Sequence, residues 1–270
     1  MPTNSKKVVL ITGGSSGIGK ALAQGVMDRG YQVAVCGRNL EKLKAAFPNA
    51  DPAQLLLVKA DVKNESDCAR FVQDSVEKFG RIDVLINNAG ISMRAMFEEV
   101  QLPVLRELMD INFWGAVQCT KYALPALKKT KGSIVGISSI AGYRGLPGRT
   151  GYSASKFALQ GFLESLRTEL LPSGVHVMWV SPGFTTSNIR NEALVADGSS
   201  QGETPLDEGG LMSAEECAAR ILVAIDSRKR TLVMTLQGKV TVWLNKLFPG
   251  LVDKLVFKHF EKEEGSPLSS

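Results

Sequence analysis

The sequence predicts an α/β fold: a Rossmann-type, doubly wound parallel sheet flanked by helices, in a single domain with a C-terminal helical extension. Three observations lead to this fold class. Short apolar runs alternate with longer helical patterns, as in right-handed βαβ units. The runs are apolar throughout, which is typical of strands covered on both faces. A glycine-rich turn over residues 12–19 follows the first run directly.

The elements follow one another in a regular order. Strands are expected over seven apolar runs, the last of them weaker: 8–11, 32–36, 55–58, 84–86, 133–137, 175–180 and 232–234. Helices are expected from the glycine turn to about residue 29 and over 65–79, 104–128, 152–170 and 213–226. Neither a linker nor a repeat interrupts the series, so residues 1–237 are expected to form one domain and 238–270 an amphipathic extension.

The glycine turn has the pattern Thr-Gly-x-x-x-Gly-x-Gly between a strand and a helix. Gly13 permits a turn that a side chain would obstruct, Gly17 lets a pyrophosphate approach the backbone, and Gly19 lets the helix pack close to the sheet. The free N–H groups of the helix N-terminus favour phosphates. The turn is therefore expected to seat a dinucleotide; a glycine-rich turn without a ligand is the alternative. The expected contacts are Gly13, Ser15, Ser16, Gly17, Ile18 and Gly19.

The end of the second strand indicates which dinucleotide binds. An acidic residue there accepts hydrogen bonds from the 2′-hydroxyl of NAD, but this chain reads Cys36-Gly37-Arg38-Asn39. Arg38 offers a cationic fork suited to a 2′-phosphate, and Ser15 or Ser16 can add a hydroxyl. The expected cofactor is NADP(H), with a solvated loop arginine as the alternative for Arg38.

Composition and charge narrow the function classes. The chain has 270 residues, 44% of them hydrophobic, and a net charge of +5. This charge suits a ligand with several phosphates, and nucleic acid is not an expected partner because no basic run with interleaved aromatics appears in the first two thirds of the chain. The four cysteines are scattered without metal-ligand spacing, so no metal is expected and the protein is expected to be cytoplasmic. The sequence holds no apolar run long enough for a membrane span.

Several motifs together resemble the short-chain dehydrogenase/reductase family, over about residues 6 to 235. The glycine turn, Asn87-Asn88-Ala89-Gly90, Ser139, Tyr152-x-x-x-Lys156 and Ser181-Pro182-Gly183 occur in the family's order. Each motif is weak alone, but their joint occurrence is specific. The resemblance implies a Rossmann-type fold, a nicotinamide cofactor and oxidoreduction at an alcohol or carbonyl carbon.

The family's catalytic tetrad falls on Asn112, Ser139, Tyr152 and Lys156. Carbonyl reduction requires an acid at the substrate oxygen, and Tyr152 can supply the proton. Lys156 lies one helical turn away and is expected to favour the phenolate, because the free phenol has a pKa near 10. Ser139 can donate a hydrogen bond to the substrate oxygen. The resemblance implies that Lys156 also holds the nicotinamide ribose, and that Asn112 bends its helix and links the lysine to solvent through water.

Further cofactor contacts come from the resemblance. Asp61 is expected to accept a bond from the adenine amine beside the Val62 backbone, although it can also cap a turn. Residues after the fourth and sixth strands are expected along the nicotinamide, where the family usually has a threonine in place of Ser187. The expected set is Asp61, Val62, Asn88, Ala89, Gly90, Tyr152, Lys156, Pro182, Gly183, Thr185 and Ser187.

Each tetrad residue also has a structural alternative. Tyr152 can be a packing residue, Ser139 a helix cap, Lys156 a surface cation and Asn112 a chance polar residue. Ser138 competes with Ser139 for the serine role, although the family's spacing favours Ser139. Four such residues in register with a cofactor turn make the combined alternative remote.

The substrate region is less specific. Residues 188–212 are polar and glycine-rich, and the resemblance implies a substrate lid there. Met93, Met96, Tyr143 and Leu146 are expected to form an apolar wall, with ordinary packing as the alternative. In the tail, apolar residues recur at helical spacing opposite a polar face, and Pro249-Gly250 is expected to split the segment into two helices. The apolar stripe is Val240, Leu244, Leu247, Leu251 and Leu255; the polar face is Asn245, Lys246, Asp253, Lys254 and Lys258.

The sequence thus predicts an NADPH-dependent oxidoreductase that interconverts a carbonyl and a secondary alcohol, with Tyr152 as general acid/base, on a lipophilic substrate. The alternatives are a non-catalytic NADP(H)-sensing protein and a membrane-associated binding protein on the same fold. The tail is expected to pack on the domain, to cover a partner subunit or to lie on a membrane surface. The family implies a homodimer or homotetramer formed through the helices that hold Asn112 and Tyr152.

Overall fold

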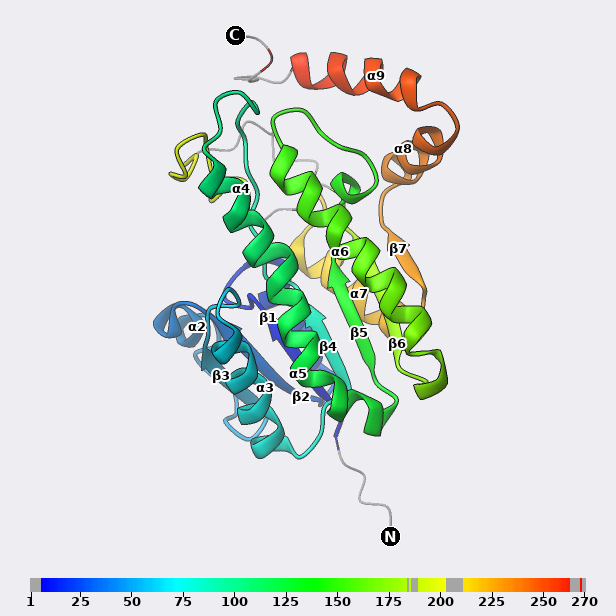
Figure 1. The fold of residues 1–270 in the computed structure, drawn as a ribbon. Coiled ribbons are helices and arrows are strands. Elements are labelled where there is room, and N and C mark those ends of the chain that lie inside the picture. The colour runs from blue at the N-terminus through cyan, green and yellow to red at the C-terminus, as the bar shows by residue number, and fades with distance from the viewer. Residues whose placement is uncertain (1–5, 184, 186–188, 203–210, 263–267, 269–270) are drawn as a thin grey trace.

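A computed structural model describes residues 6–183, 185, 189–202, 211–262 and 268 of the chain. In this part of the chain a single parallel sheet lies between two layers of helices, and two further helices stand beyond one end of it (Figure 1). The fold class predicted from the sequence is confirmed.

The sheet has seven strands in the order β3-β2-β1-β4-β5-β6-β7, all parallel. The strand order changes direction between β1 and β4. The glycine turn follows the carboxyl end of β1, and Asn88 follows the carboxyl end of β4. Ligands of doubly wound sheets bind at this point, outside the carboxyl ends of the strands. The strands are β1 Val8–Thr12, β2 Gln32–Gly37, β3 Leu55–Lys59, β4 Val84–Asn87, β5 Ser133–Ile137, β6 His176–Ser181 and β7 Thr231–Val233.

Both faces of the sheet are covered, which explains the uninterrupted apolar runs. Val8 and Leu10 of β1 belong to the core under α3, α5 and α6, whereas Val9 and Ile11 belong to the core under α1, α2 and α7. These helices are α1 Gly17–Asp28, α2 Leu40–Ala46, α3 Glu65–Phe79, α5 Gly115–Thr130, α6 Thr150–Glu169 and α7 Ala214–Asp226.

The helix expected over 104–128 is interrupted in the structure. It begins as α4 (Leu102–Met109), continues as a π-helical turn over Asp110–Trp114, and resumes as α5. The turn holds Asn112, whose side-chain hydrogen bonds are satisfied outside its own helix. Such π-helical turns often mark functional sites. The short helix α2 was not predicted, and Asn39 caps it by accepting a hydrogen bond from Lys42 N at 2.9 Å.

The tail forms two helices, α8 (Leu236–Leu247) and α9 (Pro249–Glu261), which separate at Pro249 as predicted. They stand beyond the carboxyl ends of the strands (Figure 1). The boundary at 237/238 falls in the first turn of α8 and remains a prediction. Among the described residues, none of the helices is both long and apolar enough to cross a bilayer.

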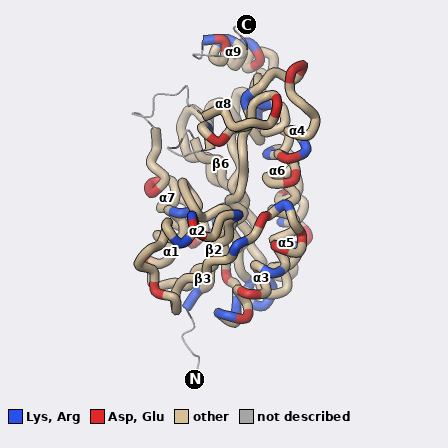
Figure 2. Tube along the Cα trace, turned by 90° about the vertical axis from the view of Figure 1, so that its left-hand side faces the viewer, with Lys and Arg blue, Asp and Glu red and all other residues tan. Residues whose placement is uncertain are grey.

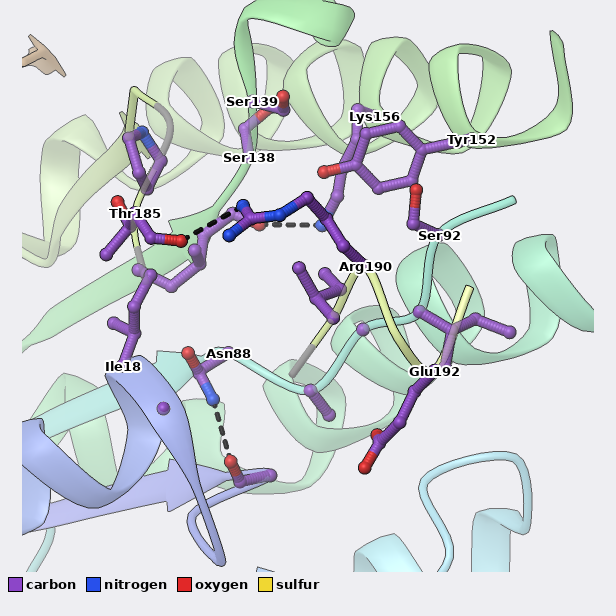
Figure 3. Close-up of a pocket in the computed structure, with 18 of the residues that line it drawn as sticks. Ile18, Asn88, Ser92, Ser138, Ser139, Tyr152, Lys156, Thr185, Arg190 and Glu192 are labelled. Carbon is purple, nitrogen blue, oxygen red and sulfur yellow. Dashed lines mark hydrogen bonds between the residues drawn. The ribbon is translucent and has the colours of Figure 1, made fainter. Parts of the chain in front are cut away.

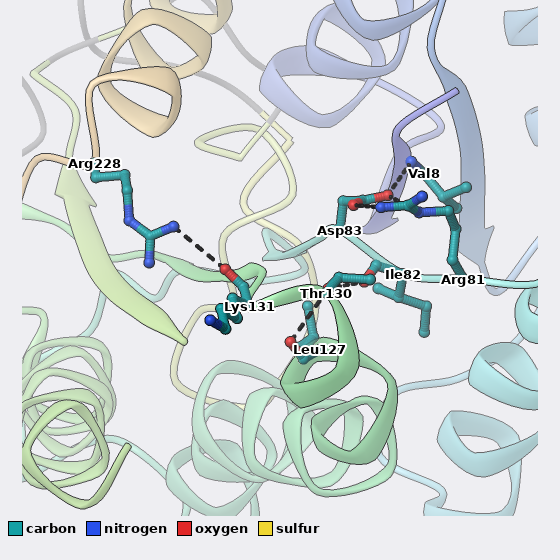
Figure 4. Close-up of polar contacts among 8 residues, drawn as sticks. All are labelled: Val8, Arg81, Ile82, Asp83, Leu127, Thr130, Lys131 and Arg228. Atoms are coloured by element: carbon teal, nitrogen blue, oxygen red, sulfur yellow. Dashed lines mark hydrogen bonds and ion pairs between the residues drawn. The ribbon is translucent and has the colours of Figure 1, made fainter. Parts of the chain in front are cut away.

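Polar contacts close the opposite end of the sheet (Figure 4). The Asp83 carboxylate accepts hydrogen bonds from the Val8 amide at 2.9 Å and from Arg81 Nε at 2.9 Å. On the same end, Arg228 donates to the Lys131 carbonyl at 3.3 Å. Because these groups satisfy one another at the amino ends of the strands, the polar groups open to a ligand gather at the carboxyl ends.

Candidate active site

A cavity of about 1650 Å³ extends from the glycine turn, past the ends of β4 and β5, to the helices of the tail. Tyr152, Lys156 and Ser139 lie along one side of it, while Asn88 and Ile18 lie on the other (Figure 3). The described residues between β6 and α7 (182, 183, 185, 189–202 and 211–213) are called the strap. Thr185, Arg190 and Glu192 of the strap line the cavity. The cavity therefore joins the predicted cofactor turn to the predicted catalytic residues in one space.

The glycine turn is held in place by the chain that follows β4. Asn88 Nδ2 donates to the carbonyls of Thr12 and Gly13, both at 2.9 Å, and Thr12 Oγ1 accepts from the amides of Asn88 and Ala89. Gly13 has a φ of +69°, and a Cβ on Gly19 would lie 2.3 Å from the Gly13 carbonyl oxygen. These contacts leave no room for side chains at either position, so the turn requires glycine.

The adenosine end of the cavity carries the residues proposed to select the cofactor. Arg38, Ser15 and Ser16 line it, and Ser16 caps helix α1 without a side-chain hydrogen bond, so its hydroxyl is available to a ligand. Arg38 is exposed, and no other described residue forms a hydrogen bond or an ion pair with it. Asp61 lines the cavity and also caps its turn, because it accepts from the Lys63 amide at 3.1 Å. Both roles considered for Asp61 are compatible with this geometry.

Tyr152 and Lys156 lie on α6 and point into the cavity beside Ser139 (Figure 3). The side chains of Tyr152 and Lys156 are almost completely buried, and Lys156 Nζ lies 5.6 Å from the centre of the Tyr152 ring. Lys156 Nζ donates to the Ile137 carbonyl at 2.8 Å, which holds the ammonium at the end of β5. The surface-cation alternative for Lys156 is therefore wrong.

Burial controls the protonation of both groups. It raises the pKa of Tyr152 above its usual value of 10, while the neighbouring Ser139 hydroxyl and the Arg149 charge act in the opposite direction. Burial also lowers the pKa of Lys156 from 10.5 to about 8. Desolvation is the largest of these effects on Tyr152, and the expectation that Lys156 favours the phenolate stays a prediction. The tyrosine keeps its proton at neutral pH.

The two serines at the end of β5 differ in their partners. Ser138 is buried and accepts a hydrogen bond from Gln160 Nε2 at 2.8 Å, whereas Ser139 lies beside the Tyr152 hydroxyl and lowers the pKa of that group. Ser139 Oγ also accepts from the Ala141 amide at 3.2 Å and so caps a short 3-10 helix. The cap and the cavity position hold together, and the contact with Tyr152 favours Ser139 over Ser138.

Asn112 lies behind this group rather than inside the cavity. Its Oδ1 accepts from the Ile91 amide at 2.8 Å, and its Nδ2 donates to the Ile91 carbonyl and to Ser155 Oγ, each at 2.9 Å. A Cβ on Gly90 would lie 3.1 Å from Asn112 Oδ1 and 3.4 Å from Lys156 Nζ, so the two polar groups approach each other across Gly90. Asn112 therefore fixes the chain that separates it from Lys156.

The remaining predicted residues have mixed placements. Ser187 lies outside the described residues. Of the expected apolar wall, Leu146 lines the cavity, whereas Met93 is fully buried in the cluster beneath α4 and Tyr143 accepts a hydrogen bond from Trp179 at 2.7 Å. Ordinary packing is thus the correct interpretation for Met93 and Tyr143. The predicted cofactor contacts that line the cavity, besides those above, are Gly17, Val62, Ala89, Gly90, Pro182, Gly183 and Thr185.

The tail packs with a different face from the one predicted. Asn245 Nδ2 donates to the Tyr143 carbonyl at 3.0 Å, and Asp253 pairs with Arg144, so two residues assigned to the outer polar face hold the tail on the domain. Val240, Leu247, Leu251 and Leu255 of the predicted stripe are instead at least 46% exposed. Both faces of these helices carry apolar residues, so periodicity alone did not identify the packed face. The tail residues that line the cavity are Gln237, Gly238, Thr241, Leu244, Val252, Leu255, Val256, His259 and Phe260.

Two arginines in the cavity were not found from the sequence. Arg149 precedes Tyr152 by one turn, and its guanidinium carbon lies 5.9 Å from the centre of the Phe260 ring. Arg190 lies in the strap after β6 and is 7% exposed. No motif marks either residue; the position of Arg149 one turn before Tyr152 was the available signal.

The residues present fit a nicotinamide dinucleotide. The turn is a cradle that a Cβ at Gly13 or Gly19 would fill, and the start of α1 offers unpaired amides to a phosphate. The cavity then leads past Asn88 to the tyrosine and lysine. The amide donors at the glycine-turn end suit an anionic ligand, and the tyrosine and lysine at the other end suit a carbonyl oxygen.

Comparisons with known proteins agree with this geometry. Residues 7–196 match the family model described as short chain dehydrogenase. The chain is 34% identical to the mouse protein named dehydrogenase/reductase SDR family member 7B, covering 97% of this chain and 84% of that one. It is 37% identical to an Arabidopsis thaliana protein named 11-beta-hydroxysteroid dehydrogenase-like 4A, covering 91% and 82%. A solved structure described as ElxO with NADP bound has a TM-score of 0.72 at 27% identity and covers 84% of this chain and 96% of that one.

Proposed function

The chain belongs to the short-chain dehydrogenase/reductase family of oxidoreductases, and from this premise we propose that it is an NADPH-dependent enzyme interconverting a carbonyl and a secondary alcohol on a lipophilic substrate. The observation that carries the proposal is the meeting of Ser139, Tyr152 and Lys156 in the cavity that begins at the glycine turn. A non-catalytic cofactor sensor would not need a buried proton donor in that position.

In the reductive direction Tyr152 acts as the general acid. When bound, the reduced nicotinamide supplies the hydride, and negative charge then develops on the substrate oxygen. Burial holds the proton on Tyr152 at neutral pH, because it raises the pKa of the phenol, and the proton is ready for transfer to that oxygen. Ser139 donates a hydrogen bond to the same oxygen and orients the carbonyl.

Lys156 stabilises the phenolate that remains after the transfer. Its ammonium is fixed by the Ile137 carbonyl and lies against the Tyr152 ring, so its charge is in place before the reaction. Asn112 holds the backbone at Ile91 and thereby the wall next to Lys156. We assign Asn112 the role of connecting the lysine to solvent protons through water.

The preference for NADPH rests on Arg38. The chain has no acidic residue at the end of β2, and Arg38 stands at the mouth of the cavity with Ser15 and Ser16 nearby on the ligand's side. A guanidinium forms charge-assisted, bidentate hydrogen bonds with a phosphate. The NADP bound by ElxO, which shares this fold, is consistent with the same choice here.

A lipophilic substrate fits the outer part of the cavity. Its wall is largely apolar there, formed by Leu146, Leu194, Leu244, Val252, Leu255, Val256 and Phe260. One relative carries the name of a steroid dehydrogenase-like protein, which agrees with a bulky apolar carbonyl or alcohol. We therefore expect steroid-, retinoid- or lipid-like carbonyls to be better substrates than small polar ones.

The direct test is a panel of carbonyl compounds assayed by NADPH absorbance, with Tyr152→Phe as the matched control. Oxidation of NADPH that depends on a carbonyl and is lost in the control supports the proposal. Tight NADPH binding without turnover on any class of carbonyl or alcohol would favour a cofactor-sensing protein instead.

We also propose a peripheral membrane contact through α8 and α9. These helices expose large apolar side chains. Basic residues, all lysines in this part of the sequence, recur along both helices (Figure 2). Such a surface can lie in the lipid interface while its lysines reach anionic headgroups. Sedimentation with liposomes, compared with a protein lacking residues 236–270, tests it. The apolar residues are Leu236, Val240, Trp243, Leu247, Phe248, Leu251 and Phe257.

Self-association is proposed through the surface of α5 and α6. Tyr122 on α5, Phe157 on α6 and Trp114 in the π-helical turn just before α5 are exposed, which is unusual for large aromatic side chains and typical of interfaces. Size-exclusion chromatography with light scattering would distinguish a dimer or tetramer from a monomer. All four cysteines are free and buried, which fits the reducing conditions of the cytoplasm, the compartment we propose.

A further inference from the structure

We propose that Arg190, a buried arginine of the strap between β6 and α7, binds the diphosphate of the cofactor. This inference rests on the proposed function, because it concerns the same nicotinamide dinucleotide. It adds a second cationic contact with a different task from Arg38. Arg190 would recognise the anionic bridge that NADH and NADPH share, and Arg38 the 2′-phosphate that NADPH alone carries.

Arg190 is placed where such a contact is possible. Its side chain is 7% exposed, and it crosses the cavity with its guanidinium between the side of Thr185 and Ile18 and the side of Lys156 (Figure 3). Arg190 Nη1 donates to the Thr185 carbonyl at 3.1 Å. The group therefore lies among residues expected to contact the cofactor, between its phosphate turn and its catalytic end.

The backbone of the strap directs this side chain inward. The Leu194 amide donates to the Ser92 carbonyl at 2.9 Å, and the Arg94 amide donates to the Leu194 carbonyl at 2.8 Å, which fixes the strap on the chain after β4. The Ala193 amide donates to the Arg190 carbonyl at 3.1 Å and turns the chain at this point. The backbone of Arg190 is thus fixed by hydrogen bonds, and its side chain extends into the cavity.

The donor atoms of Arg190 form a planar fork that suits two phosphate oxygens at once. In the cavity the start of α1, at Gly17 and Ile18, offers its amides to the same anion. A diphosphate seated on this helix would therefore be held from below by backbone amides and from above by Arg190.

The position of Arg190 along the cavity distinguishes its proposed role from those of the two other arginines, Arg38 and Arg149. Arg38 stands beyond the end of β2, so the 2′-phosphate is accounted for by that residue. Arg149 lies on the substrate side, against Phe260, and its charge lowers the pKa of the Tyr152 phenol. The diphosphate lies between these two ends in any extended dinucleotide that reaches from Arg38 to Tyr152.

The test measures equilibrium binding without turnover, by fluorescence or calorimetry, for three ligands: NADPH, NADH and adenosine 2′-monophosphate, which has the 2′-phosphate but no diphosphate. Arg190→Gln is expected to raise the Kd of NADPH and NADH by the same factor, about ten- to a hundredfold, from the loss of a charge-assisted contact. The Kd of adenosine 2′-monophosphate is expected to stay unchanged. Arg190→Lys, which keeps the charge but loses the fork, is expected to give an intermediate Kd.

Arg38→Gln is the contrasting variant, since it should weaken adenosine 2′-monophosphate and NADPH but spare NADH. Arg230→Gln, at an exposed site far from the cavity, is the control for charge, and it should leave all three ligands unaffected. Unchanged binding of adenosine 2′-monophosphate also shows that Arg190→Gln is folded at the glycine-turn end.

Three results would overturn the inference. The first is an unchanged Kd for NADPH and NADH in Arg190→Gln and Arg190→Lys, when the unsubstituted protein binds both; the proposed function then survives without it. The second is selective loss of NADPH or of adenosine 2′-monophosphate, which places Arg190 at the 2′-phosphate. The third is a higher KM for the carbonyl with unchanged cofactor binding, which places it at the substrate. A protein that binds neither dinucleotide refutes the proposed function itself.

Discussion

The buried ammonium of Lys156 is expected to lower the free energy of unfolding of the protein. Its side chain is 4% exposed, and burial lowers its pKa from 10.5 to about 8. At about 1.36 kcal/mol for each pH unit, the charged form in the folded protein is disfavoured by roughly 3 kcal/mol. Replacement by methionine removes this penalty and keeps a flexible chain of similar length, but it leaves the Ile137 carbonyl without its donor, which costs about 1–3 kcal/mol.

Lys156→Met is therefore expected to be inactive, yet at pH 7 as stable as the parent or more stable by up to about 2 kcal/mol. The free energy of unfolding of the parent is expected to increase as the pH rises, for the following reason. Below pH 8 the lysine is charged in both the folded and the unfolded protein, so the penalty is complete. Between pH 8 and 10.5 only the unfolded chain holds the proton, so the penalty disappears as the pH rises.

Urea unfolding of the parent and of Lys156→Met at pH 7 and pH 10 measures this effect. The free energy of unfolding of the parent, relative to the variant, is expected to rise by about 2–3 kcal/mol between the two pH values. Lys121→Met, at an exposed position on α5, serves as the control and should show no such change. A difference between parent and Lys156→Met that stays constant with pH, or a variant that is less stable by several kcal/mol at pH 7, would refute the reasoning.

Four further outcomes are expected. Tyr152→Phe should lower kcat by more than about 100-fold with NADPH binding nearly intact, because the ring still packs but the proton donor is gone; substantial activity would remove Tyr152 from the mechanism. Arg38→Ala should weaken NADPH about ten- to a hundredfold and NADH far less; equal loss would show that Arg38 does not bind the 2′-phosphate. In the parent, kcat/KM for reduction should fall as the pH rises through about 8, where Lys156 loses its proton, and a profile that is flat from pH 7 to above 9 would exclude the lysine's charge from the step. Removing residues 236–270 should leave NADPH binding intact while turnover of bulky lipophilic carbonyls falls more than that of small ones; aggregation or loss of NADPH binding would instead make the tail part of the core.

The fold was predictable because its elements have local signals. Buried parallel strands such as Val8–Thr12 are apolar at every position, and helix α3 was predicted with its bounds, Glu65–Phe79, since a glycine in the left-handed region ends it. The glycine turn was predictable for a similar reason, because the close approach of Gly19 to Gly13 leaves no alternative residue.

The less predictable features depend on contacts between distant segments. Arg190 enters the cavity because its strap pairs with the chain after β4, about 100 residues earlier, and no periodicity in the sequence encodes that pairing. The same holds for Asp253, which appeared to belong to a solvent-facing stripe until Arg144 proved to be its partner. The raised pKa of Tyr152 likewise results from burial by the whole fold rather than from its spacing to Lys156.

The division of the cavity along the chain has a consequence for biosynthesis. The described residues predicted to contact the cofactor all precede α7, whereas the roof over the substrate end comes from α8 and α9, which are made after α7. Domains fold from the N-terminus as the chain leaves the ribosome. The sheet and its glycine turn can therefore form, and the dinucleotide can bind, while the roof is still inside the exit tunnel. A nascent chain would then acquire affinity for its cofactor before it acquires a site for its substrate.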